Sequence, residues 1–491
     1  MLQLRPITGG RTNIRRTGLA TGLVLFLLAI APLTLAGQSG TAGVPDTPAA
    51  KQFFAWLAAF NSGDATTLGN FLKANFPERE DRLNRQLDFR NRTGGFEFKR
   101  AESSSPTKFT GVVQERNSDQ VARFTLEVEE AEPHRIINLQ LNVIPPGEGA
   151  PIPRMPEADL LAALRARLGR EEAAGTFSGS VLVAKGGKPV FAGAYGLANR
   201  EARVPNTLET RFRIGSMNKM FTAIAILQLV EAGKIALGDA LAKYLPNYPN
   251  QELAAKVTIQ ELLTHTGGTG DFFGPEFDAH RLELRTLEDY VKLYGKRGPA
   301  FEPGSRWEYS NYGFLLLGVV IEKVSGQSYY DYVEAHVFKP AGMTSTGSLP
   351  EDQKVPERSI GYTREGSKDW SPNTDTLPYR GTSAGGGYST VGDLGRFADA
   401  LLGHKLLNAA NTALLTTGKV ETPRGDKYAY GFVDSEENGM RCFGHGGGAP
   451  GMNGDLRICP GSGYVVAVLS NLDPPAAQNI STFVVNRLPA K

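Results

Sequence analysis

The sequence predicts an α+β fold in which an antiparallel sheet is flanked by helices and joined to an all-helical region, preceded by a smaller α+β domain. Strand-like runs stand near residues 179–196 and 454–471, at both ends of the larger part, with mostly helical sequence between them. A segment with five prolines, residues 145–157, separates this part from a shorter one. The chain of 491 residues is also too long for one ordinary hydrophobic core.

The first 36 residues predict a secretory signal peptide. A basic start with no acidic residue precedes an apolar run at 19–36, which ends in small residues at Ala36. An uncleaved membrane anchor is the alternative, because these 18 residues approach the length of a bilayer span. We therefore expect export to the periplasm or the medium, membrane attachment only if the signal is kept, and no integral membrane span after cleavage.

Charge and composition exclude several classes of protein. The formal net charge is +2, and removing the four arginines of residues 1–36 would leave −2, so the body lacks the basic surface of a nucleic-acid-binding protein. Hydrophobic residues at 41% and charged residues at 21% are typical of a folded globular protein. The six histidines are scattered, so we expect no metal site and no cofactor.

The shorter part begins after a small, polar stretch at 37–48 that predicts a flexible leader. Between residues 49 and 144, apolar residues first repeat with helical spacing and then alternate in strand-like runs. Helices followed by antiparallel strands indicate a small α+β domain. This stretch resembles the cone-shaped NTF2-like (SnoaL-like) domains in pattern alone, which implies no activity, and a generic α+β accessory module is the alternative. The strands are expected near 96–104, 108–116, 120–130 and 135–143.

The larger part, residues 158–491, combines elements from both of its ends. An amphipathic helix over about 157–175 is followed by a hairpin with its turn at Gly186-Gly187. Two strands and a helix around 475–488 close the chain. We expect the strands from both ends to share one sheet, with a helical insertion against it.

An apolar helix that begins just after Ser216 carries the first candidate site. Ser216 and Lys219 lie three residues apart, where helix N–H groups favour a developing anion. Burial would lower the pKa of Lys219, and its neutral amine could then act as the general base for the serine. The alternative is that Ser216 only caps the helix. The same spacing between Ser105 and Lys108 lies among strands, so spacing alone decides nothing.

A second polar motif, Tyr309-Ser310-Asn311, precedes another buried helix. A neighbouring lysine can favour the phenolate form of Tyr309 and make it a proton shuttle, and Asn311 can hydrogen-bond both a lysine and a substrate carbonyl. The alternative is that Tyr309 is an ordinary amphipathic side chain that lines a wall and takes no part in catalysis. Tyr248-Pro249-Asn250 matches in part, and we interpret it as a surface turn.

A third motif, His445-Gly446-Gly447, falls on the first strand of the C-terminal hairpin. Its glycines would let a substrate backbone approach the strand closely, with His445 over the same cleft. The alternative is a glycine-rich turn with an exposed histidine. Two partial matches have simpler interpretations: Lys185-Gly186-Gly187 as a hairpin turn and His265-Thr266-Gly267 as a helix stop.

The three motifs together resemble the serine β-lactamase and penicillin-binding-protein superfamily. The resemblance covers about residues 155–488 and is nearest to the class C (AmpC-like) branch, which includes esterases and D-amino-acid peptidases. It implies a β-lactamase/transpeptidase-like fold. "SMNK", "YSN" and "HGG" occur in that order, with 93 residues from Ser216 to Tyr309 and 136 from Tyr309 to His445. Supporting stretches are "LLTHTGGTGDF" (262–272), "PGSRWEYSNYGFLLLG" (303–318) and "SAGGGYSTVGDLGRF" (383–397).

The resemblance implies a role for each matching residue. Ser216 would be the acylated nucleophile, with Lys219 and Tyr309 as the base and proton-transfer pair. Asn311 would orient the substrate. The backbone N–H groups of Ser216 and Gly448 would form the oxyanion hole.

The strand motif implies both a binding surface and a substrate preference. Gly447 and Gly448 would border the substrate, and His445 would belong to the catalytic group. Many β-lactamases carry a lysine at the position of His445, whereas a histidine is mostly neutral at pH 7. We therefore expect a small-molecule or peptide substrate with an ester, amide or lactam carbonyl, and hydrolysis of esters or D-amino-acid amides before efficient β-lactam hydrolysis.

Rival functions remain to be compared with the structure. A true β-lactamase and a weakly catalytic binding or scaffolding protein are the alternatives within the same fold. An α/β-hydrolase is a different class, for which Ser383, Asp434 and His445 fall in the expected chain order. The sequence around Ser383 is loop-like and the chain lacks alternating βαβ units, which disfavours that class.

The two cysteines flank the C-terminal hairpin. Cys442 and Cys459 are either two buried thiols or a disulfide, which an exported location would allow. Their mutual geometry decides between the two.

Overall fold

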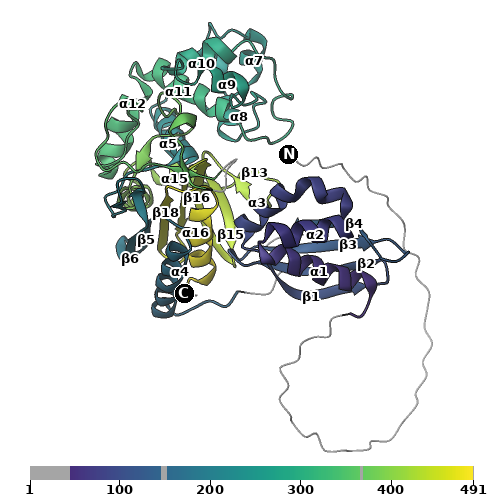
Figure 1. Cartoon of the computed structure of the whole chain (residues 1–491). Coiled ribbons are helices and arrows are strands. Elements are labelled where there is room, and N and C mark those ends of the chain that lie inside the picture. Colours follow the sequence, from purple (N-terminus) through teal and green to yellow (C-terminus); the bar gives the residue numbers. More distant parts are fainter. Residues whose placement is uncertain (1–44, 145–151, 365–368, 490–491) are drawn as a thin grey trace, which may run out of the picture. The chain divides into compact units, whose positions relative to one another are not determined.

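The computed structural model describes residues 45–144, 152–364 and 369–489, and Figure 1 shows its elements. The predicted signal peptide at 1–36 lies outside the described residues, as do most of the predicted leader and part of the predicted linker. Within the described ranges, no helix combines the length and the apolar character that crossing a membrane requires.

Residues 45–144 form helices followed by a four-stranded antiparallel sheet, and the strands lie where the sequence predicts them. The sheet order follows the chain order. The elements are α1 (Pro48–Ser62), α2 (Ala65–Asn75), a 3₁₀ turn η1 (Pro77–Arg82), α3 (Leu83–Thr93), β1 (Phe96–Ser104), β2 (Lys108–Glu115), β3 (Val121–Val128) and β4 (Ile136–Val143).

Aromatic side chains fill the space between α1 and this sheet. The ring of Phe53 stacks on Phe124 of β3 with centroids 3.8 Å apart, and it meets Phe109 of β2 edge-on at 5.5 Å. The leader predicted to reach residue 48 ends earlier, because α1 starts at Pro48 with Thr47 as its cap. The sequence did not predict η1 and α3, because their residues are mostly polar and give a weak periodic pattern.

The larger part is built on one antiparallel sheet, which has eight strands in the described part of the chain. Its order is β13-β14-β15-β16-β17-β18-β5-β6, so strands from both ends of this part pair, as predicted. The three strands β13 to β15 extend one edge and were not predicted, since two of them are only two residues long. The strands are β5 (Gly179–Lys185), β6 (Lys188–Tyr195), β13 (Val420–Glu421), β14 (Lys427–Tyr428), β15 (Val433–Glu437), β16 (Met440–Ala449), β17 (Met452–Cys459) and β18 (Tyr464–Ser470).

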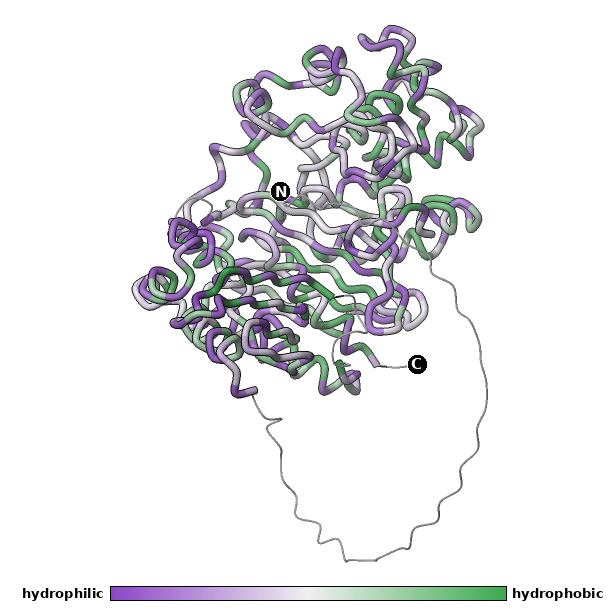
Figure 2. The backbone as a smooth tube through the Cα atoms, turned by 90° about the vertical axis from the view of Figure 1, so that its right-hand side faces the viewer, coloured by the Kyte–Doolittle hydropathy of each residue, from purple (hydrophilic) through white to green (hydrophobic). Residues whose placement is uncertain are grey.

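Alternate residues of the central strands face two different cores. Val181 and Val183 of β5 pack with α4 (Glu157–Ala173) and α16 (Ala476–Arg487), both near their predicted positions. Leu182 of β5 belongs to the other core, which includes the helical insertion. Hydrophobic and hydrophilic stretches alternate along the backbone of the described residues (Figure 2). The predicted hairpin turn is confirmed, with left-handed φ values at Gly186 and Gly187.

The helical insertion and the segments around it supply the remaining elements. The helices are α5 (Asn218–Glu231), α6 (Leu241–Tyr244), α7 (Gln251–Lys256), α8 (Ile259–Leu263), α9 (Pro275–His280), α10 (Leu287–Tyr294), α11 (Asn311–Ser325), α12 (Tyr329–Val333), η3 (Glu334–Phe338), α13 (Lys339–Ala341), η4 (Thr374–Thr376), α14 (Val391–Leu402) and α15 (Ala409–Thr416). The short strands are β7 (Leu197–Asn199), β8 (Val204–Pro205), β9 (Phe212–Arg213), β10 (Tyr362–Thr363), β11 (Ser371–Pro372) and β12 (Tyr388–Ser389). Helix α5 is buried along nearly its whole length, which explains why its apolar residues occur on more than one side.

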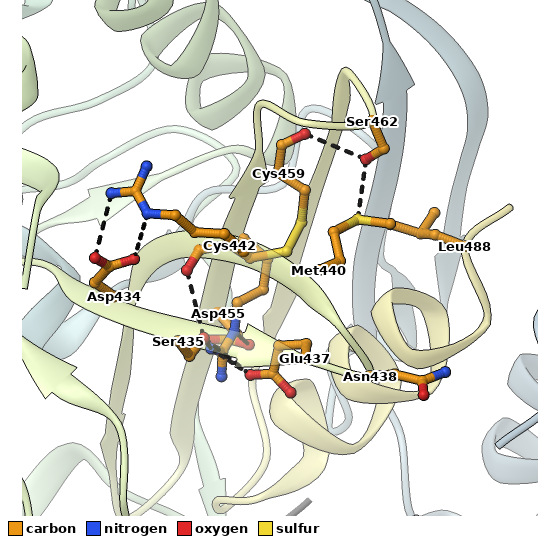
Figure 3. The surroundings of a disulfide bond; sticks show 12 residues. Asp434, Ser435, Glu437, Asn438, Met440, Cys442, Asp455, Cys459, Ser462 and Leu488 are labelled. Atoms are coloured by element: carbon orange, nitrogen blue, oxygen red, sulfur yellow. Dashed lines mark hydrogen bonds and ion pairs between the residues drawn. A yellow bond between two sulfur atoms is a disulfide. The ribbon is translucent and has the colours of Figure 1, made fainter. Parts of the chain in front are cut away.

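A disulfide joins the two neighbouring strands of the C-terminal hairpin. Cys442 of β16 and Cys459 of β17 are both buried, and their Cα atoms lie 4.2 Å apart (Figure 3). The bond lies three residues before His445 on the same strand, so it ties the strand of the third motif to its neighbour.

Replacing both cysteines, Cys442→Ala with Cys459→Ala, should lower the free energy of unfolding by about 3 kcal/mol, because the bond restricts the unfolded chain. The loop that it closes has a sequence separation of 17 residues. Urea unfolding followed by circular dichroism measures the change. Wild-type protein reduced beforehand is the control and should unfold at the same midpoint as the variant. Equal midpoints for the variant and the oxidised wild type would contradict a stabilising bond.

Candidate active site

Ser216 lies in a tight turn between β9 and α5, the 3₁₀ turn η2 (Gly215–Met217). Gly215 has a φ of +52°, and a Cβ there would meet the backbone nitrogen of Gly448 at 3.1 Å. A Cβ at Gly447 would lie 1.9 Å from the carbonyl oxygen of Ile214. Glycine at these positions therefore lets β16 pack directly against the turn that carries the serine.

The interpretation of Ser216 as a helix cap does not agree with the structure. Helix α5 begins without a side-chain cap, and its N-cap position is Met217. The Ser216 side chain is partly exposed, and its Oγ lies 3.2 Å from the amine of Lys219. The serine hydroxyl is thus held by the lysine rather than by the helix backbone.

Lys219 is completely buried, and its amine has three oxygen neighbours. Nζ donates to Asn311 Oδ1 at 2.7 Å and to the carbonyl oxygen of Ala384 at 2.5 Å, besides its contact with Ser216. Burial lowers the pKa of Lys219 to about 7, although the negative charge of Asp271 acts to raise it. A large fraction of the amine is therefore neutral near pH 7.

The neighbours of Lys219 determine where its lone pair points when it is neutral. A backbone carbonyl can only accept a hydrogen bond, so one N–H stays on Ala384. The Asn311 amide donates through Nδ2 to Asp271 Oδ2 at 2.9 Å, which leaves its Oδ1 as a second acceptor. Both hydrogens of the neutral amine are then used, and the lone pair faces Ser216 Oγ. This arrangement can take the proton of the serine.

Tyr309 lies in the loop before α11, beside the lysine. Lys219 Nζ is 4.7 Å from the centroid of its ring. Burial raises the pKa of Tyr309 well above its usual value, and the interaction with the Ser216 side chain opposes this only in part. The resting site therefore does not favour the phenolate expected beside a lysine, because desolvation raises the pKa of Tyr309 and the nearby charge of Asp271 raises it too. Tyr309 is a protonated hydrogen-bond donor.

His445 is 6% exposed and forms part of the wall of the site, in contrast to the alternative of an exposed histidine. Its Nδ1 lies 2.5 Å from the Gly446 carbonyl oxygen and its Nε2 lies 3.0 Å from Tyr428 Oη. Burial, with a smaller effect of Lys219, lowers the pKa of His445 to about 4. The imidazole is neutral at pH 7, and both of its nitrogens are engaged by the protein.

The structure also tests the partial matches. Lys108 forms an ion pair with Glu127 on the exposed surface of the sheet, so its amine is not buried as that of Lys219 is. Pro249 is exposed and Asn250 caps α7, but Tyr248 is 3% exposed and its hydroxyl contacts that of Tyr312, so the interpretation as a surface turn does not hold for the tyrosine. His265 does end a helix, with a φ of +61° just after α8. It is also buried beside Tyr309, which the sequence did not indicate.

The alternative α/β-hydrolase triad is not assembled. The Ser383 hydroxyl is buried against the carbonyl oxygen of Leu315, and Asp434 forms an ion pair with Arg441. His445 contacts Tyr428 instead of either residue. The sheet is antiparallel, and Ser383 lies in a turn before the short strand β12 rather than in the strand-turn-helix that a nucleophile elbow needs.

Four groups of the site were not predicted. Asp271 and the Ala384 carbonyl lie within stretches noted as landmarks, yet no chemical reason in the sequence singled them out. His265 was interpreted only as a helix stop. Tyr428 lies on a two-residue strand that gave no pattern. Among the described residues, no group of three or more His, Cys, Asp or Glu side chains is arranged to hold a metal ion.

Comparisons with known proteins find relatives over the larger part of the chain. The family model described as Beta-lactamase matches residues 160–489. Penicillin-binding protein 4 of Amycolatopsis lactamdurans is 31% identical over 295 residues, which cover 57% of this chain and 76% of that protein.

Solved structures show the same fold. A penicillin-binding protein from Bacillus halodurans is 37% identical with a TM-score of 0.59, covering 64% of this chain and 98% of that one. A D-stereospecific amidohydrolase from a Streptomyces species is 29% identical with a TM-score of 0.56, covering 67% and 98%. The predicted β-lactamase/transpeptidase-like fold is thereby confirmed.

Replacing Asp271 by asparagine should lower the pKa of Lys219 further, since the Asp271 charge acts to raise it. Asparagine can still accept the hydrogen bond from Asn311. Labelling of Ser216 by a fluorophosphonate should speed up as pH rises through about 7 in the wild type, because the lysine must be neutral to take the proton. In Asp271→Asn this rise should shift to lower pH.

Asp434→Asn is the control for that shift, because it removes a carboxylate paired with Arg441 on the sheet. Its labelling profile should coincide with that of the wild type. A wild-type rate that does not change between about pH 5 and pH 9 would argue against Lys219 as the base.

Proposed function

The chain belongs to the beta-lactamase family of serine hydrolases, and on this premise we propose that it hydrolyses esters or D-amino-acid amides through an acyl-enzyme on Ser216. One observation carries the proposal most directly. The buried Lys219 amine donates its two hydrogens to two acceptors, Asn311 Oδ1 and the Ala384 carbonyl. When the amine is neutral, its lone pair therefore points at the Ser216 hydroxyl. The lowered pKa of Lys219 beside a partly exposed serine argues against a scaffolding protein without activity, because such shifts concentrate at functional sites.

Acylation follows from these positions. Ser216 Oγ attacks the substrate carbonyl carbon while its proton passes to the neutral Lys219 amine. The backbone N–H groups of Ser216 and Gly448 would hold the oxyanion, and the Asn311 amide would orient the substrate. Tyr309 donates its proton to the departing oxygen or nitrogen, and the Lys219 ammonium restores that proton.

Deacylation uses the same groups in reverse. A water molecule attacks the acyl-enzyme carbonyl and gives one proton to the Lys219 and Tyr309 pair. Collapse of the second tetrahedral intermediate returns a proton to Ser216 Oγ and releases the acid. All atoms and protons are then back in their starting places.

The wall around His445 favours uncharged groups next to the scissile carbonyl. Its imidazole is neutral, so a substrate carboxylate would find no permanent positive charge there. Esters and amides suit this wall better than β-lactams that carry a carboxylate. The amidohydrolase relative supports an amide substrate, whereas the penicillin-binding relatives keep β-lactam hydrolysis as the second candidate.

The remaining features of the chain belong to the same proposal. We assign residues 158–491 as the catalytic domain and residues 49–144 as an accessory domain. The N-terminal pattern at 1–36 supports export to the periplasm or the medium.

Ser216→Ala should abolish covalent labelling and lower kcat for p-nitrophenyl esters by about 10⁴-fold or more, because the nucleophile is lost. A panel of short-chain esters, D-alanine amides and a chromogenic cephalosporin tests the substrate class. We expect esters or D-amides to have the highest kcat/KM in the wild type. Ser105→Ala, which alters the exposed Ser-x-x-Lys match, is the control and should leave every rate unchanged. A cephalosporin rate higher by orders of magnitude would overturn the substrate assignment.

A further inference from the structure

His265 is a buried side chain beside the reacting groups for which the proposed chemistry has no use. It is 1% exposed and follows α8 with a left-handed backbone. Its carbonyl oxygen accepts from the N–H of Glu308 at 3.0 Å, and its Nδ1 accepts from the N–H of Ser310 at 3.1 Å. His265 therefore holds the loop of Tyr309 at two points, one on each side of the tyrosine.

The ring of His265 also contacts the aromatic side chains around it. Its centroid lies 4.2 Å from that of Tyr309 and 4.5 Å from that of Tyr428. Its Nε2 is buried without a hydrogen-bond partner among the described residues. A buried donor without a partner costs free energy, so hydrogen bonding at Nε2 does not account for this ring position. The Nδ1 hydrogen bond from Ser310 and the ring contacts with Tyr309 and Tyr428 do.

Tyr428 continues this series of contacts to the opposite wall of the site. The Gly446 carbonyl can only accept, so the neighbouring Nδ1 of His445 carries the proton. Nε2 of His445 is then an acceptor, and the Tyr428 hydroxyl donates to it across 3.0 Å. The Gly446 carbonyl thereby fixes the tautomer of His445, and Tyr428 holds the direction of its ring on β16.

We propose that His265 and Tyr428 are positioning residues that hold the Tyr309-Ser310-Asn311 loop and the His445-Gly448 strand at a fixed separation on either side of Ser216. The inference deepens the proposed function and rests on it. In the transition state, Tyr309 must reach the leaving group while the N–H of Gly448 reaches the oxyanion. These two groups lie on different elements, and His265 with Tyr428 forms a continuous link between them.

The inference predicts a loss of kcat when either end of the link is removed. His265→Ala removes both the acceptor for Ser310 and the ring between the two tyrosines, and should lower kcat for ester hydrolysis by about tenfold to a hundredfold. KM should change much less, because the substrate contacts themselves remain. His265→Asn should recover only part of the loss, since asparagine tolerates the left-handed backbone and its Oδ1 can accept from Ser310, but it lacks the ring that contacts Tyr428.

Tyr428→Phe tests the other end while keeping the ring. It removes the hydroxyl that donates to His445 and should lower kcat to a similar degree. Tyr430→Phe is the matched control, because it removes the hydroxyl of another buried tyrosine of the same segment, whose ring lies near Lys419. This control should keep the wild-type kcat.

The double variant His265→Ala with Tyr428→Phe shows whether the two residues form one link. If they do, kcat of the double variant should be close to that of the single variant with the lower kcat. Losses that multiply, or wild-type kcat in Tyr428→Phe, would overturn the inference. If His265→Ala does not fold, as thermal unfolding would show, the comparison of Tyr428→Phe with Tyr430→Phe decides.

Labelling of Ser216 separates this inference from the proposed function. A wild-type protein that neither labels at Ser216 nor hydrolyses the ester panel would overturn both. A wild type that labels and turns over, with all positioning variants equally fast, would overturn only the link between His265 and Tyr428.

Discussion

The burial of one amine is the constraint on which the rest of the site depends. The pKa of Lys219 falls from 10.5 to about 7, so its surroundings, burial opposed by the charge of Asp271, disfavour the charged form by about 5 kcal/mol. This buried amine lies on helix α5, next to the partly exposed side chain of Ser216. A solvated lysine would remain charged at neutral pH and could not take the proton of Ser216.

Three segments far apart in the chain have to meet for this burial to occur. Helix α5 brings the amine, the start of α11 brings Asn311, and the loop before β12 brings the carbonyl of Ala384. The disulfide-linked strand β16 closes the site from the sheet side, where Gly447 permits contact with the turn of Ser216. Sheet and helical insertion are therefore both required, and neither alone would exclude water from the amine.

Much of the framework could be predicted from local patterns. The strands of residues 96–143, the hairpin at Gly186-Gly187 and the helix α16 follow from periodicity and turn residues, which act over a few neighbours. The short strands β13 to β15 and the polar helix α3 could not, because their positions depend on pairing and packing with distant segments. Tyr428 was missed for the same reason.

The sequence by itself determined the order and residue types of the three motifs, and with them the family and the candidates Ser216, Lys219, Tyr309 and His445. Only the tertiary structure decided the chemical state of these residues. Desolvation makes Lys219 partly neutral, keeps Tyr309 protonated and leaves His445 uncharged with both nitrogens engaged. Burial and hydrogen bonding depend on what distant segments place around a side chain, and no local pattern contains that information.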